Sequence, residues 1–475
     1  MISFSIALLV LVAGYFIYGS FVERVFAPDY EKKTPALVHP DGVDYLPLPS
    51  WRIFMIQFLN IAGLGPIFGA IMGAKFGTAS YLWIVLGTIF AGAVHDFLAG
   101  MISLSNDGES LPQIIGRYLG RGTQRVFGVF AIVLMILVGA VFVSGPAEIL
   151  ASMTEWNPFL WIAIIFAYYV LATLLPIDKI IGRVYPLFAI ALIFMALGIL
   201  VMLFVKQPSL PEMWNGFGTK YETSPIFPMM FISIACGAIS GFHATQSPLM
   251  ARCMTNVRIG RPIFYGAMVT EGIVALIWAA VATYFFAENG VADESGRVFS
   301  GAAVAKSICH DWLGSFGYVL AMLGIVFAPI TSGDTALRSA RLMVADTLGM
   351  EQRSIPRRLM VSIPLFVLTI GILAYSLIDK NGFAIIWRYF AWCNQTLSVF
   401  TLWAITVYLY TAKKLYYVTL IPALFMTAVC TTYMCVAPEC LGSIFPTAQE
   451  YSYYISIAVA VLALLCFCGW AKRRK

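Results

Sequence analysis

The sequence predicts an all-α polytopic membrane protein with about 13 transmembrane helices, on the evidence of its composition, its apolar runs and its charge distribution. Of the 475 residues, 60% are hydrophobic and 11% are charged, whereas soluble domains have roughly 45–50% apolar and 25% charged residues. A soluble fold could not bury so much apolar surface, but lipid tails solvate it and a helix satisfies its own backbone hydrogen bonds. The lipid bilayer is therefore the first expected partner.

Each predicted span is apolar over the length that crosses about 30 Å of hydrocarbon. The first span has no positively charged residue before it and no charge until Glu23, so we expect an uncleaved helix rather than a signal peptide. The predicted spans are residues 2–20, 52–72, 80–104, 125–152, 159–175, 185–205, 226–250, 262–287, 316–340, 359–378, 383–411, 416–434 and 450–470.

The lysines and arginines test this count, with the N-terminus outside and the C-terminus inside. The inner segments hold 23 of the 30: four in 24–52, three in 117–125, two in 179–183, three in 252–261, five in 338–358, two at 413–414 and four in the tail. Arg388 lies within a span, and the outer segments hold six: Lys75, Lys206, Lys220, Arg297, Lys306 and Lys380. The positive-inside rule expects this excess, and one miscounted helix would invert every later loop.

The second predicted span is interrupted by the stretch from Asn60 to Pro66, which includes Gly63 and Gly65. Glycine costs about 1 kcal/mol and proline about 3 kcal/mol in a helix interior, so we expect the helix to open here. Freed backbone groups at membrane depth are tolerated beside a cavity, which makes these four residues candidates for substrate binding.

The seventh predicted span carries a similar stretch, from Ser240 to Pro248. Its candidate binding residues are Ser240, Gly241, His243, Thr245 and Gln246. The two spans have opposite directions, which indicates two inverted repeats of five spans each, residues 51–206 and 225–411. An accessory helix and loop (1–50) precede them, and two accessory helices and a basic tail (415–475) follow. The alternative is that the glycines only allow close helix packing.

Several segments resemble the carbon starvation protein A family, in order along nearly the whole chain: IAGLGPIFGA, GAVHDF at 92–97, NDGESL at 106–111, SGFHA at 240–244, GDTALRSAR at 333–341 and NQ at 394–395. The resemblance implies a leucine-transporter-like fold with discontinuous second and seventh helices. It implies ion-coupled alternating-access import of a peptide across the bacterial cytoplasmic (inner) membrane. Pyruvate or another small monocarboxylate is the alternative substrate, and the chain is shorter than the long members of the family.

Asp96 follows His95 inside the third span, where a lone carboxylate costs a few kcal/mol. A proton or a sodium ion would compensate its charge, so Asp96 is a candidate for ion coupling, and the alternative is that it anchors a loop arginine. In the ninth span the resemblance places a sodium site at Thr331, Ser332 and Thr335. Asp334 is a further candidate, unless it pairs with Arg338 four residues later.

His243 is one of four histidines and could bind a carboxylate, carry a proton or simply pack. Asn394 and Gln395 are further candidates for substrate binding, and like Glu148 and Glu271 they are weaker ones that could equally tie helices together. Helices that begin at a break present free N–H groups, which attract a carboxylate. Arg388 could neutralise the same carboxylate or extend to the membrane surface.

Other classes of protein find less support. The sequence has no HExxH motif, phosphate-binding loop or catalytic triad, so we expect no enzyme and no cofactor beyond a coupling proton or sodium ion. A channel would not need two opposed halves with interrupted helices. The basic residues are scattered, which argues against a nucleic-acid partner. Nine cysteines show no zinc-site spacing, and a disulfide between Cys435 and Cys440 stays open.

Overall fold

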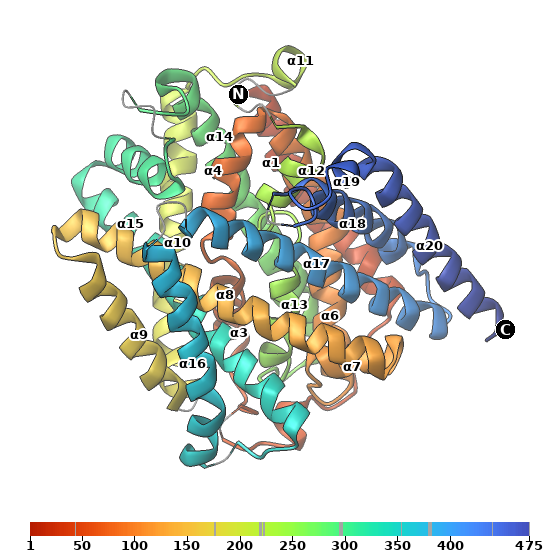
Figure 1. Cartoon of the computed structure of the whole chain (residues 1–475). Helices are drawn as coiled ribbons and strands as arrows, with labels where there is room; N and C mark the ends of the chain where they lie inside the picture. Colours follow the sequence, from red (N-terminus) through yellow and green to blue (C-terminus); the bar gives the residue numbers. More distant parts are fainter. Residues whose placement is uncertain are drawn as a thin grey trace.

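The computed structural model describes all residues except 43, 175–176, 218–220, 222–223, 294–297, 353, 379–381, 439 and 475. Figure 1 shows the helical arrangement. The helices are α1 (Ile2–Phe26), α2 (Pro35–Val38), α3 (Ser50–Ile61), η1 (Gly65–Gly69), α4 (Ala70–Gly73), η2 (Ala74–Phe76), α5 (Ala79–Gly87), η3 (Thr88–Gly92), α6 (Ala93–Ser105), α7 (Leu111–Leu119), α8 (Arg121–Thr154), α9 (Pro158–Leu174), α10 (Ile177–Lys206), α11 (Met213–Gly216), α12 (Ile226–Ser233), α13 (Gly241–Ala251), η4 (Val257–Ile259), η5 (Arg261–Gly266), α14 (Ala267–Asn289), α15 (Gly301–Leu348), α16 (Ile355–Ile378), α17 (Gly382–Thr411), α18 (Tyr417–Val436), α19 (Pro446–Glu450) and α20 (Ser452–Lys472).

Among the described residues, nine helices are long and apolar enough to cross a membrane, or ten if the bent pair Ser50–Ile61 and Gly65–Phe76 is one span. The chain is therefore a multi-pass membrane protein. The other three predicted spans correspond to the shorter apolar helix α9, to the pair α12 and α13, and to α17. The count of thirteen stays a prediction.

The long helix α15 packs most extensively against α8 and α10. Ser300 caps its first turn, because the Ser300 side chain accepts a hydrogen bond from the Ala303 N–H. The helix bends at Gly314, whose φ of 63° is open to glycine at little steric cost. The bend separates the first turns from the apolar part that packs in the core.

The segments predicted to lie outside contact one another. The Ser3 hydroxyl accepts a hydrogen bond from the Met213 N–H, Lys206 donates to Asp311 O, and Lys306 donates to Ser152 O. The N-terminus and α11 accordingly lie together in Figure 1. The predicted outer residues Lys220, Arg297 and Lys380 lie outside the described residues, as do Arg353, Lys475 and the side chains of Lys179 and Arg183 from the inner set.

The segments predicted to lie inside also contact one another. Arg252 donates to Gly108 O at 2.9 Å, and Arg258 lies 3.8 Å from Glu31. Lys414 donates to Phe26 O. These contacts join outer segments to outer segments and inner segments to inner segments. This is the pattern expected when successive spans alternate in direction.

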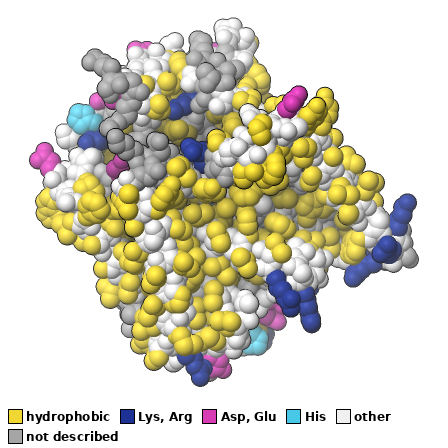
Figure 2. All heavy atoms as spheres, in the orientation of Figure 1, with side chains coloured by type: hydrophobic (Ala, Val, Ile, Leu, Met, Phe, Trp, Pro, Cys, Tyr) yellow, Lys and Arg dark blue, Asp and Glu magenta, His cyan; other side chains and the backbone are white. Residues whose placement is uncertain are grey.

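The outer surface of the bundle is suited to lipid. Large apolar side chains are exposed along several helices, including Ile17 of α1, Val205 of α10 and Leu465 of α20. Figure 2 shows hydrophobic side chains over most of one face, with most charged side chains near its ends. Cys435 is buried, and the structure contains no disulfide between Cys435 and Cys440.

Candidate functional site

The first predicted break is confirmed. Helix α3 ends at Ile61, the chain is not helical over 62–64, and η1 begins at Gly65 with Pro66 in its first turn. The two parts are bent by 52°. The last turn of α3 is held by α15, because the Ser332 hydroxyl donates to Leu59 O at 3.0 Å and Thr335 Oγ1 lies 3.4 Å from Asn60 Oδ1.

The second break lies earlier than the sequence predicted. Helix α12 ends at Ser233, α13 begins at Gly241, and the non-helical stretch is 234–240. The prediction of a break over 240–248 is therefore wrong, except for Ser240. The polar residues of α13 are compatible with a helix because their hydroxyls bond back to its carbonyls: Thr245 donates to Phe242 O and Ser247 donates to His243 O.

Three side chains from other helices satisfy the backbone of the second break. Trp83 Nε1 donates to Ile234 O at 3.3 Å, and Thr88 Oγ1 donates to Gly237 O at 2.9 Å. Asn394 Oδ1 accepts from the Ser240 hydroxyl at 2.9 Å and from the Phe242 N–H at 2.7 Å. Asn394 therefore caps the N-terminus of α13 from a different helix.

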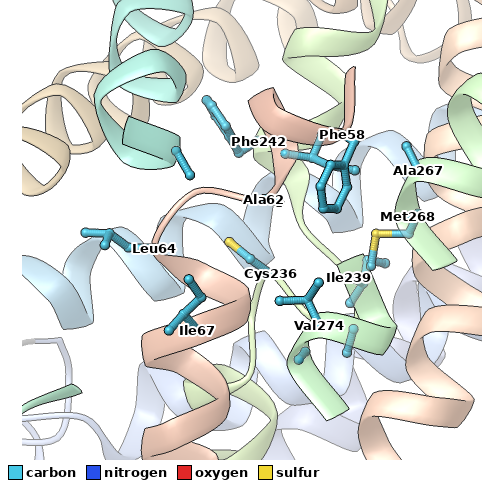
Figure 3. Packing of buried hydrophobic residues seen from close by; sticks show 14 of the residues in the cluster. Phe58, Ala62, Leu64, Ile67, Cys236, Ile239, Phe242, Ala267, Met268 and Val274 are labelled. Atoms are coloured by element: carbon cyan, nitrogen blue, oxygen red, sulfur yellow. The ribbon is translucent and has the colours of Figure 1, made fainter. Parts of the chain in front are cut away.

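The two breaks lie against each other, as Figure 3 shows around Ala62, Leu64 and Cys236. A Cβ on Gly65 would overlap the Cys236 side chain, and a Cβ on Gly69 would lie 2.8 Å from Ser233 O. Glycine is required at both positions because the backbones approach closely. Gly63 is equally confined, by Phe142 and by the Ser332 hydroxyl, and Gly241 is confined by the α17 backbone.

Gln246 and Gln395 hold the halves of the second broken helix. Gln246 Nε2 lies 2.9 Å from Thr245 Oγ1 and 3.4 Å from Ser339 Oγ of α15. Gln395 Nε2 donates to Phe231 O of α12 at 3.1 Å. Among the described residues, several buried polar atoms near the breaks have no hydrogen-bond partner: Gln57 Oε1 and Nε2, Asn60 Nδ2, Gln246 Oε1 and Gln395 Oε1. Such atoms are suited to binding a polar ligand.

The predicted sodium residues are only partly brought together. Ser332 and Thr335 reach the first break, whereas the Thr331 hydroxyl bonds to carbonyls of its own helix, Phe327 O and Ala328 O. Asp334 lies towards α10, where it accepts a hydrogen bond from Tyr185 at 2.6 Å. Arg338, the alternative partner of Asp334, donates to Ala172 O of α9.

A chain of titratable side chains connects α6, α13 and α14. Asp96 Oδ1 lies 2.8 Å from His95 Nδ1, and Asp96 Oδ2 lies 2.9 Å from His243 Nδ1. The other nitrogen of His243, Nε2, lies 3.4 Å from Glu271 Oε2. All four side chains have an exposed fraction of 0%. Asp96 is therefore partnered by two histidines, and the alternative that it anchors a loop arginine is wrong.

Sequence reasoning missed Gln57 and Cys236, and it gave Glu271 little weight. Glu271 had a visible signal: with Asp96 and His243 it is an ionisable group in an apolar span, and such groups usually pair. Gln57 and Cys236 had none, because only the fold places them beside the breaks. Glu148 and Arg388 have exposed side chains, so neither belongs to this buried site.

A multi-pass helical bundle in which two interrupted helices meet among buried polar groups defines a secondary transporter. The family model described as carbon starvation protein CstA matches residues 1–154, 143–305 and 288–433. The chain therefore belongs to this family, and the resemblance drawn from its motifs is confirmed. It is a transporter and not an enzyme.

Its relatives include transporters with named substrates. An uncharacterized membrane protein of Haemophilus influenzae is 42% identical over 60% of this chain and 91% of its own. The peptide transporter CstA of Campylobacter jejuni is 27% identical over 88% of this chain and 78% of its own. The pyruvate/proton symporter BtsT of Escherichia coli is 30% identical over 56% of this chain and 47% of its own.

The fold is shared with solved transporter structures. The manganese transporter of Eremococcus coleocola superposes with a TM-score of 0.54 at 13% identity, over 92% of this chain and 99% of the other. At this identity the likeness concerns the fold alone.

Proposed function

We propose that the protein imports a small carboxylate-bearing nutrient by proton-coupled alternating access, with the solute bound where the two breaks meet. The contact between Gly65 and Cys236 carries this proposal, because it joins two interrupted helices at one point among unpartnered polar atoms. The second break ends where α13 begins, and the dipole of this helix favours an anionic group there in addition to the Asn394 cap on the Phe242 N–H. A peptide is the first candidate substrate and pyruvate the second, since relatives are named for both.

Alternating access follows from two inverted repeats, residues 51–206 and 225–411, that rock around the site. Each predicted repeat contains one of the two breaks, which supports this division. The accessory segments 1–50 and 415–475 flank the repeats, which gives about thirteen spans in total.

The membrane is the bacterial cytoplasmic membrane, with the N-terminus outside and the C-terminus inside. The distribution of lysine and arginine supports this orientation. The separate contacts within the two sets of loops also support it, because each set contains only segments assigned to one side.

The coupling ion is a proton, as in the name of the symporter BtsT. Sodium is the second candidate, because hydroxyl groups of Ser332 and Thr335 lie against the first break, with Thr331 one turn before Thr335. Hydroxyl and carbonyl oxygens are the ligands that a hard cation prefers.

Transport by the purified protein in proteoliposomes tests the proposal. Labelled pyruvate and labelled dialanine are supplied separately, each with and without sodium and with and without an inward proton gradient. We expect accumulation of one solute that needs the proton gradient and not sodium, and counterflow when the vesicles are preloaded with the unlabelled solute. Absence of counterflow with both solutes would contradict a carrier of this class, because a pore shows no stimulation by solute on the opposite side.

A further inference from the structure

His95, Asp96, His243 and Glu271 form a buried cluster whose net charge depends on how many protons its side chains hold. A neutral imidazole has one N–H, so His243 donates towards both carboxylates only when it is protonated. Cys236 is a further titratable side chain beside His243. A net charge in the interior costs several kcal/mol, so the cluster cannot gain or lose a proton without a compensating change around it.

Open hydrogen-bonding positions distinguish this cluster from a structural ion pair. Neither oxygen of Glu271 has a hydrogen-bond partner among the described residues, and the same is true of Nε2 in both His95 and His243. The 3.4 Å between His243 Nε2 and Glu271 Oε2 is longer than a normal N–H···O bond. A buried carboxylate with a purely structural role would be fully hydrogen-bonded.

The cluster is joined directly to the place where the two breaks meet. The backbone N–H of His243 donates to the backbone carbonyl of Ser240 at 3.3 Å, and Ser240 is the last residue of the second break. Cys236 lies between His243 on one side and Gly65, directly after the first break, on the other. The cluster therefore lies directly beside the backbone that lines the proposed solute site.

We propose that these four side chains form the site of the coupling proton, that His243 and Glu271 exchange this proton, and that Asp96 and His95 position His243. In the transfer the Nε2–H bond of His243 breaks, nitrogen keeps the electron pair, and a lone pair of Glu271 Oε2 forms the new O–H bond. Water supplies and removes the proton on the two sides of the membrane. This inference rests on the proposed function and specifies its coupling site.

The Glu271→Gln variant tests the assignment, because glutamine has the shape of a protonated glutamate but cannot release a proton. Wild type and variant are reconstituted with labelled pyruvate and, separately, labelled dialanine. With an inward gradient of about one pH unit, one coupled proton supports roughly tenfold accumulation. We expect Glu271→Gln to lose this accumulation and the solute-driven proton movement, which pyranine reports, while it keeps counterflow with a rate that no longer depends on pH.

Glu148→Gln is the matched control, because Glu148 is a glutamate of the spans whose side chain is exposed. It should behave as wild type in every assay. His243→Gln is a second variant that keeps a hydrogen-bond donor towards Asp96 but cannot carry a proton, and it should show the same uncoupled behaviour.

The outcomes separate this inference from the proposed function. Proton-driven accumulation by Glu271→Gln or His243→Gln would overturn the coupling site while leaving the transporter assignment intact. A wild-type protein that shows no counterflow with either solute would overturn the proposed function itself.

Discussion

Gly65 begins the helix that follows the first break and Cys236 lies in the second break, and they touch so closely that any side chain on Gly65 would collide with the Cys236 side chain. The contact makes the two interrupted helices one structural unit. It also explains why glycine occupies a position where it weakens the helix: the gain lies in the approach of the two backbones.

Gly65→Ala should therefore impair transport. Overpacking a well-packed interior costs about 1–3 kcal/mol, which corresponds to roughly a 5–150-fold effect on affinity or rate. Initial solute uptake in proteoliposomes measures the effect. Gly371→Ala is the control, because a Cβ at Gly371 in α16 meets no atom within 4 Å. Equal loss of activity in both variants would contradict a specific role for Gly65.

Asn394→Ala should raise the KM for the solute and lower the melting temperature in detergent. The change removes the acceptor for the Ser240 hydroxyl and the Phe242 N–H. Loss of a helix cap costs about 1 kcal/mol, and buried donors without partners add about 1–3 kcal/mol. Asn157→Ala removes an equivalent cap from the Phe159 N–H in the exposed first turn of α9. It should lower stability slightly and leave KM unchanged, and a raised KM in this control would contradict the assignment.

Replacement of sodium by choline should leave the rate of uptake unchanged, because the proposed coupling ion is a proton. Ser332→Ala tests the same point from the protein side, since it removes the hydrogen bond to Leu59 O. We expect it to alter the rate equally with and without sodium. Strict sodium dependence, with a half-saturating concentration that rises in Ser332→Ala, would favour the sodium site instead.

The orientation is tested by cysteine substitutions at two exposed positions. His310 belongs to the predicted outer loop and is 70% exposed, whereas Glu351 belongs to the predicted inner loop and is 72% exposed. A membrane-impermeant maleimide should label His310→Cys in intact cells and Glu351→Cys only in inverted vesicles. The unsubstituted chain gives the background from native thiols. The reverse pattern would contradict an external N-terminus.

Glu212→Gln should lower the melting temperature near neutral pH by about 1–3 °C. Burial opposes the charge of Glu212, but hydrogen bonds from the Met1 ammonium and from the Ile2 and Ser3 N–H groups outweigh it and lower the pKa of Glu212 to about 2. A pKa that is depressed in the folded state stabilises the protein above the unfolded value, 4.5. The difference from wild type should therefore be full at pH 7 and shrink as the pH falls from 4.5 towards 2. A difference that is independent of pH would contradict this pairing.

Much of the fold could be predicted because bilayer physics acts on single segments. An apolar run of sufficient length crosses the membrane whatever its neighbours, and a Gly-Leu-Gly-Pro stretch opens a helix wherever it lies. The first break was predicted correctly for this reason. The second was misplaced because the stretch Ile234 to Ile239 has a single glycine, Gly237, and no proline, and Trp83, Thr88 and Asn394 stabilise its open form from elsewhere in the fold.

Individual residues of the site could be predicted from the sequence, but their contacts with one another could not. Asp96, His243 and Asn394 stood out because polar groups in apolar spans need a reason to be there. Their partners depend on how α6, α13, α14 and α17 pack, and helix packing cannot be deduced from the periodicity of one chain. The same limit explains why Thr331 and Asp334, which are adjacent to Ser332 and Thr335 in sequence, face other groups in the structure.

Asn394 and Gln395 are neighbours in α17, yet Asn394 binds the start of α13 and Gln395 binds α12 near its end. The single helix α17 thus binds both parts of the interrupted helix, α12 and α13, and connects them to each other. We therefore expect the two parts of the interrupted helix to move together with α17 when the solute site opens to either side of the membrane.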